Sequence, residues 1–187
     1  MRLYLFIGVV VILIHSVRGE PLHSLYFNPD VSGELVHSAV EMKALLGVAI
    51  GLVFVITSQL ASRYFTWAQS LNELFSKVFV GCSPLYLSGL AFSSSFVEEL
   101  LFRGMLIPNI GLVWSSIIFG LVHIPPKRTA WPWTASALVM GFIFGWLYQI
   151  TGDLTAPFIA HFTINDLNLK YLASASHTEE PSTGESS

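Results

Sequence analysis

Ionisable and amide side chains interrupt the apolar second half of this sequence at a few positions. An ionised group at the centre of a bilayer costs at least about 2.5–3.5 kcal/mol on insertion scales, so such residues are rare in membrane segments and usually functional. The candidates for chemistry are Glu98, Glu99, Arg103, His123, His161 and Asn165.

The two adjacent glutamates predict two different roles. Glu99 and Arg103 are four residues apart with the acid first, which is the favourable order for an ion pair on one helix. Glu98 points about 100° away around the same helix and has no helical partner. A carboxylate in an apolar site is suited to accept and return a proton, so Glu98 is the candidate general base. A purely structural Glu99–Arg103 pair that ties helices together is the alternative for those two residues.

Two polar residues in the last apolar stretch also share one helix face. His161 and Asn165 are four residues apart, so both side chains project in the same direction. Imidazole and carboxamide groups are donors that can hold an oxyanion. Each of them, like His123, also has a structural interpretation as an interhelical hydrogen-bonding residue. Asp166 is expected to be a supporting or interfacial residue.

A depth estimate tests whether these residues can meet. At about 1.5 Å per helical residue, Glu98 lies roughly 14 Å and Asn165 roughly 16 Å from the outer ends of their segments. His123 lies about 20 Å from the outer end of its own segment. All of them therefore fall in one layer of a hydrocarbon core about 30 Å thick.

The high hydrophobic and low charged content of the chain predicts that its helices lie in a membrane. Of 187 residues, 53% are hydrophobic and only 11% are charged, whereas a soluble domain carries about 25% charged residues. We therefore expect an all-α, polytopic bundle of about six transmembrane helices, with an interfacial amphipathic helix within residues 62–81. The expected apolar segments are residues 3–17, 44–61, 84–107, 110–124, 134–150 and 154–172.

A single transmembrane domain is expected over residues 1–173. The first segment is either a signal peptide or a retained helix, and the weak cleavage sequence after it favours a retained helix. Residues 174–187 are predicted to be a disordered polar tail.

The charge and the cysteine content limit the possible classes of binding partner, and the charge distribution predicts the orientation in the membrane. A net charge of −3 without a basic run gives no support for nucleic-acid binding, and the single Cys82 excludes an internal disulfide. Six spans would place both termini on the side richer in Lys and Arg, which is the cytoplasm. We therefore expect a multi-pass cell-membrane protein with a cytoplasmic C-terminus. The cations expected on that side are Arg2, Arg63, Lys77, Lys127, Arg128 and Lys170.

Three ordered motifs resemble those of a known family. Residues 96–104 (FVEELLFRG) resemble the EExxxR motif of the CAAX protease and bacteriocin-processing family, which comprises glutamate-type intramembrane endopeptidases. Residues 119–123 (FGLVH) and 160–165 (AHFTIN) resemble its FxxxH and HxxxN motifs. The resemblance covers about residues 85–172, and the first 80 residues are not diagnostic.

The resemblance implies roles for the matched residues. Glu98 would activate water with help from His123, His161 and Asn165 would stabilise the oxyanion, and Glu99 with Arg103 would shape the site. No cofactor is expected. Zinc held by Glu98, His123 and His161 is the less favoured alternative, because three ligands on three helices can in principle bind it.

The implied partners are the lipid bilayer and a membrane-associated protein or peptide. The substrate would be a prenylated CAAX protein, a leader peptide or a C-terminal sorting helix, and the sequence does not choose among them. Two other functions stay open: a non-catalytic scaffold or immunity protein of the same fold, and an ion-coupled transporter. The transporter is disfavoured by the small size and by the lack of an inverted repeat.

Overall fold

The computed structural model describes residues 2–28, 33, 35–125 and 131–175, and its regular elements are helices. The all-α prediction is confirmed for this part of the chain. The elements are α1 (Arg2–Val17), η1 (Leu22–Leu25), α2 (Val40–Tyr64), α3 (Thr66–Phe79), α4 (Pro84–Glu99), the π-helical segment η2 (Leu100–Leu106), α5 (Ile107–Val122), α6 (Trp131–Thr151) and α7 (Thr155–Ala175).

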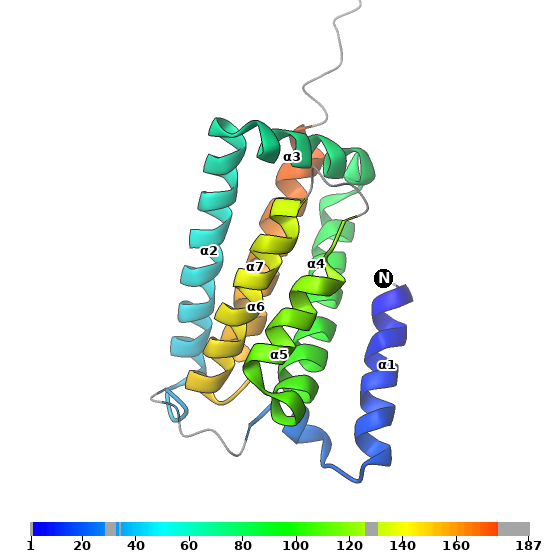
Figure 1. Ribbon diagram of the computed structural model, residues 1–187, viewed down its shortest axis with the longest axis vertical. Coiled ribbons are helices and arrows are strands. Elements are labelled where there is room, and N and C mark those ends of the chain that lie inside the picture. The colour runs from blue at the N-terminus through cyan, green and yellow to red at the C-terminus, as the bar shows by residue number, and fades with distance from the viewer. Residues whose placement is uncertain (1, 29–32, 34, 126–130, 176–187) are drawn as a thin grey trace, which may run out of the picture.

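The long helices stand side by side, and α3 crosses one end of them (Figure 1). Helix α2 packs along α7, α5 packs along α6, and α4 packs against α7. Helix α1 stands at the edge of the bundle, where it contacts α4 and η2 (Figure 1). The site-bearing helices α4, α5 and α7 therefore have neighbours that fix their positions.

A reversal at Gly111 turns the segment from α4 to α5 into a hairpin. Gly111 has φ +80°, a left-handed conformation that glycine adopts without steric cost. It lies 13 residues after Glu98 and 12 residues before His123. The two arms of the hairpin are thus of nearly equal length, which brings Glu98 and His123 to the same level.

The start of α7 is fixed by a buried ion pair. Asp153 Oδ1 accepts the backbone N–H of Thr155 at 2.8 Å, so Asp153 caps the start of α7. Its other oxygen accepts a hydrogen bond from Lys43 Nζ, which also donates to Thr151 O at 2.8 Å. Lys43 and Asp153 are both buried. This contact ties α2 to α7 and thereby sets the height of His161 and Asn165.

Three helical segments are long and apolar enough to cross a membrane: Val40–Tyr64, Pro84–Val122 and Trp131–Thr151. The Pro84–Val122 segment contains the reversal at Gly111. Helix α1 is apolar but has only 16 residues, and α7 does not meet the same criterion among the described helices. A multi-pass membrane protein is thus supported, while six spans and the interfacial position of α3 stay predictions.

Some expectations fall on residues outside the described ranges. Helix α7 continues to Ala175, so the polar tail predicted from residue 174 begins inside a helix. Residues 176–187 of that tail, and the cations Lys127 and Arg128, lie outside the described residues.

Candidate active site

Glu98 lies between two histidines from two other helices. Its Oε2 atom is 3.8 Å from His123 Nε2 and 3.7 Å from His161 Nε2. That oxygen is buried and makes no hydrogen bond with the residues that the structure describes. The Glu98 side chain is 15% exposed and the His123 side chain 20%, whereas Glu99 is fully buried. The structure therefore brings three of the four predicted catalytic residues together, with the partly exposed Glu98 side chain between the two histidines.

Glu99 makes the ion pair with Arg103 that the spacing predicts, and it also contacts α7. Arg103 Nη1 donates to Glu99 Oε1 at 3.0 Å, and His161 Nδ1 lies 2.8 Å from the same oxygen. A carboxylate can only accept, so the His161 Nδ1–H donates to it. The sequence did not predict this contact, which fixes the orientation of the His161 ring.

Arg103 is held by rings as well as by charge. Its guanidinium carbon lies 4.5 Å from the centre of the Phe119 ring and 5.3 Å from that of Phe144. Nη2 also donates to Gly141 O on α6 at 3.3 Å. Arg103 is 1% exposed. Arg103 therefore links η2 to α5 and α6. Because it is almost completely buried, its side chain is not open to a substrate.

His123 is oriented by its own helix. The Nδ1 atom lies 2.7 Å from Phe119 O, a carbonyl that can only accept, so Nδ1 carries the proton. In the tautomer with its proton on Nδ1, the other nitrogen, Nε2, is the acceptor, and it faces Glu98. The His123 ring also lies against the rings of Phe119 and Trp133, with centroids 4.6 and 6.0 Å away. Its position at the end of α5 thus supplies an acceptor beside the Glu98 carboxylate.

Asn165 points toward α4 one helical turn from His161. Its Nδ2 atom donates to Ser94 Oγ and to Ser95 Oγ, both at 3.2 Å. These serines lie four and three residues before Glu98, and therefore on its side of α4. Sequence reasoning did not single them out, although the run of three serines at 93–95 in an apolar segment was a visible signal.

The backbone changes its helical winding between Glu99 and Arg103. Immediately after Glu99 the chain enters the π-helical segment η2, which contains Arg103. Such wide turns are rare and occur frequently at functional sites. Glu99 and Arg103 still meet across the transition.

Asp166 lies outside this cluster. It accepts from Ser88 Oγ at 2.6 Å and from Lys170 Nζ at 2.8 Å. The supporting or interfacial role expected for Asp166 stays a prediction.

Metal binding was the alternative for the three converging side chains. Among the described residues, no group of three or more His, Cys, Asp or Glu side chains is arranged to hold a metal ion. The Nδ1 atoms of both histidines are already engaged by Phe119 O and Glu99. The zinc hypothesis is left for direct metal analysis.

Comparisons with known proteins agree with the motifs. Residues 81–167 match the model of a family described as type II CAAX prenyl endopeptidase Rce1-like. The chain is 30% identical over 120 residues to YpbD, an uncharacterised protein of Bacillus subtilis (strain 168). That alignment covers 64% of this chain and 63% of the relative, so the chain spans less than two thirds of the relative's length. No solved structure matches the chain.

Proposed function

We propose that the domain at residues 81–167, which belongs to the Rce1-like type II CAAX prenyl endopeptidase family, hydrolyses peptide bonds within the membrane. The observation that carries the proposal is the Glu98 carboxylate, whose buried Oε2 faces His123 Nε2 and His161 Nε2 and makes no hydrogen bond with the described residues. A partly accessible base beside two imidazoles is the arrangement that water activation needs.

In this mechanism Glu98 removes a proton from a water molecule, and the water oxygen bonds to the carbonyl carbon of the scissile peptide. His123 Nε2 accepts a hydrogen bond from the other O–H group of the water and thereby orients the water molecule. Glu98 then passes its proton to the amide nitrogen, the C–N bond breaks, and the products are a carboxylic acid, which keeps the second water hydrogen, and an amine. General-base catalysis of this kind contributes typically about 10²–10⁴-fold.

The tetrahedral oxyanion is held by donors on α7. In this role His161 carries protons on both ring nitrogens, with Nδ1–H donating to Glu99 and Nε2–H donating to the oxyanion. Asn165 exchanges a hydrogen bond to Ser94 or Ser95 for one to the substrate. Glu99 and Arg103 keep these donors in place.

The substrate is a membrane-associated protein or peptide, because the site lies among apolar helices. The classes to test are a prenylated CAAX protein, a leader peptide and a C-terminal sorting helix. The orientation proposed is a cytoplasmic C-terminus in the cell membrane.

The experiment is cleavage by the purified full-length chain in lipid vesicles. Three probes are used: a farnesylated CAAX peptide, a leader peptide and a peptide with an apolar C-terminal helix, with new termini identified by mass spectrometry. Cleavage of at least one probe at a defined bond supports the enzyme. Binding of a probe without cleavage supports the scaffold, and proton or ion flux across the vesicle membrane without cleavage supports the transporter.

A further inference from the structure

Two rows of polar contacts join α4 to α7, one helical turn apart. In the first row Glu98 Oε2 lies 3.7 Å from His161 Nε2. In the second row Asn165 Nδ2 donates to Ser94 Oγ and to Ser95 Oγ, both at 3.2 Å. The step from the first row to the second is four residues back along α4 and four residues forward along α7, which is about 6 Å on each helix. The two helices therefore run in opposite directions, and the Asn165 carboxamide lies one turn from the proposed general base.

The hydroxyl group of Ser94 can only accept a hydrogen bond from Asn165. A serine hydroxyl carries one hydrogen, and the hydrogen of Ser94 is donated to Ala91 O at 3.1 Å within α4. Ser94 is also buried, so water does not compete for its oxygen. The Ser94 oxygen therefore accepts from the NH2 end of a carboxamide and has no hydrogen to give to the C=O end. It distinguishes two ends that are alike in size and opposite in hydrogen-bonding character.

The orientation of the Asn165 carboxamide decides what this side chain can do. Its NH2 group donates and its C=O group only accepts, while an oxyanion needs donors. A carboxamide turned the other way would place its oxygen where negative charge develops. Ser95 accepts from the same nitrogen, but its own hydrogen has no acceptor within the part of the chain that the structure describes. Ser95 could therefore bond to either end, and Ser94 is the residue that selects the NH2 end.

We propose that Ser94 is a positioning residue for Asn165 and fixes the orientation in which Asn165 donates to the oxyanion. The inference rests on the proposed function. Ser94 keeps one hydrogen of Asn165 Nδ2, and the other hydrogen leaves Ser95 for the substrate oxygen as charge develops on it. Without the Ser94 acceptor both orientations of the carboxamide are open, and only one of them stabilises the charge.

Ser94→Ala and Ser93→Ala are a matched pair on one helix. Ser93 is the preceding residue, and its hydroxyl donates to the backbone of α4, at 2.9 Å to Gly89 O and 3.1 Å to Leu90 O. In the active vesicle system Ser94→Ala should lower kcat about threefold to tenfold, the effect of losing one neutral hydrogen bond. KM should stay within twofold of wild type, because the oxyanion exists only after substrate has bound. Ser93→Ala should keep the wild-type kcat, and Ser94→Thr, which retains a hydroxyl able to bond to the preceding turn, should recover most of the lost rate.

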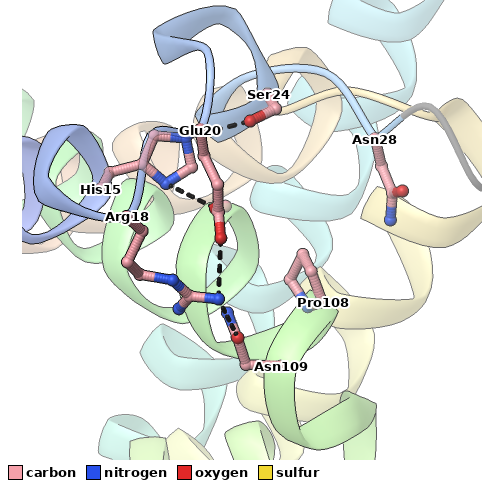
Figure 2. A pocket seen from close by; sticks show the side chains of 8 residues that line it. His15, Arg18, Glu20, Ser24, Asn28, Pro108 and Asn109 are labelled. Carbon is pink, nitrogen blue, oxygen red and sulfur yellow. Dashed lines mark hydrogen bonds and ion pairs between the residues drawn. The ribbon is translucent and has the colours of Figure 1, made fainter.

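A double-mutant cycle separates positioning from a general effect on the fold. If Ser94 acts through Asn165, Ser94→Ala has no further effect on kcat once Asn165 is replaced by alanine. Ser24→Ala is the control for loss of a structural hydroxyl, because Ser24 Oγ lies 3.0 Å from His15 Nε2 in a polar pocket beside Asn109 (Figure 2). It should leave kcat unchanged in both backgrounds. A normal kcat of Ser94→Ala, or its full effect repeated in Asn165→Ala, overturns the positioning role.

A second readout does not depend on proteolysis. Isotopic nitrogen labelling of asparagine makes the side-chain NH2 groups visible in an NMR spectrum of the protein in detergent, and Asn165→Ala identifies the signals of Asn165. Ser94→Ala should shift these signals, and Ser93→Ala should leave them at the wild-type position. Where Ser94→Ala folds poorly, Ser94→Cys is read in the same way, because a thiol is a weak acceptor. Unchanged Asn165 signals refute the contact. If no probe is cleaved while the signals shift as expected, the proposed function fails and the orienting contact stands.

Discussion

His161 donates from Nδ1 to Glu99 Oε1 at 2.8 Å, and this contact joins α7 to α4 in the interior of the bundle. The same oxygen accepts from Arg103 Nη1 at 3.0 Å. The fully buried carboxylate of Glu99 thus binds both Arg103, one turn further along the same helical segment, and His161 on α7. The stability of the bundle and the geometry of the proposed active site therefore depend on the same residue.

Replacing Glu99 by Gln should reduce the yield of folded protein. The change leaves the Arg103 guanidinium buried without its counter-charge, and breaking a buried pair in this way typically costs about 3–5 kcal/mol. Thermal unfolding of the purified protein in detergent measures the loss. The matched control is Glu73→Gln, an exposed glutamate on α3, which should unfold at the wild-type temperature.

A double replacement separates the two roles of Glu99. Glu99→Leu combined with Arg103→Met removes both charges, and such exchanges are often neutral or stabilising. The double variant should therefore fold better than Glu99→Gln but remain inactive, because His161 has lost its acceptor. Wild-type turnover in the folded double variant would show that Glu99 does not orient His161 for catalysis.

Metal analysis distinguishes the two ways of activating water. If Glu98 and His123 act alone, the purified protein contains no stoichiometric zinc and keeps its activity under strong chelation. His161→Asn should then slow turnover but leave residual activity, since asparagine can still donate to the oxyanion. A zinc site needs three protein ligands at roughly 2.0–2.2 Å, so the same variant would lose metal and activity together. One equivalent of zinc whose removal abolishes cleavage contradicts the metal-free mechanism.

The orientation is tested with reporters at two points. A reporter fused after Ser187 should be active only if it functions in the cytoplasm, because the Lys and Arg distribution places both termini there. One inserted near Asn28 should report the opposite side. The reverse pattern would contradict the cytoplasmic C-terminus, and two reporters on the same side would mean that the number of spans after Asn28 is even.

Local spacing predicted the parts of this site that lie on one helix. The Glu99–Arg103 pair follows from the four-residue spacing of the two side chains on one helix. The depth estimate also predicted that Glu98 and His123 share a level, because the helical rise is constant.

Contacts between distant segments could not be derived in this way. Glu99 and His161 are 62 residues apart, and Lys43 and Asp153 are 110 residues apart. Lys43 directly precedes the apolar segment 44–61 in the sequence, yet it is buried because α2 packs on the start of α7. The position of α1 likewise depends on how a short apolar helix docks on α4, which its composition does not specify.

Turnover by Glu98→Gln, measured beside Glu73→Gln in the same vesicles with the same probes, tests the central claim most directly. The amide keeps the shape of the side chain but cannot accept the proton of water. We predict that Glu98→Gln folds and inserts like the wild type while its kcat falls by about 10²–10⁴-fold or more, and that Glu73→Gln cleaves at the wild-type rate. Near-wild-type cleavage by folded Glu98→Gln would remove Glu98 from the mechanism and contradict the account.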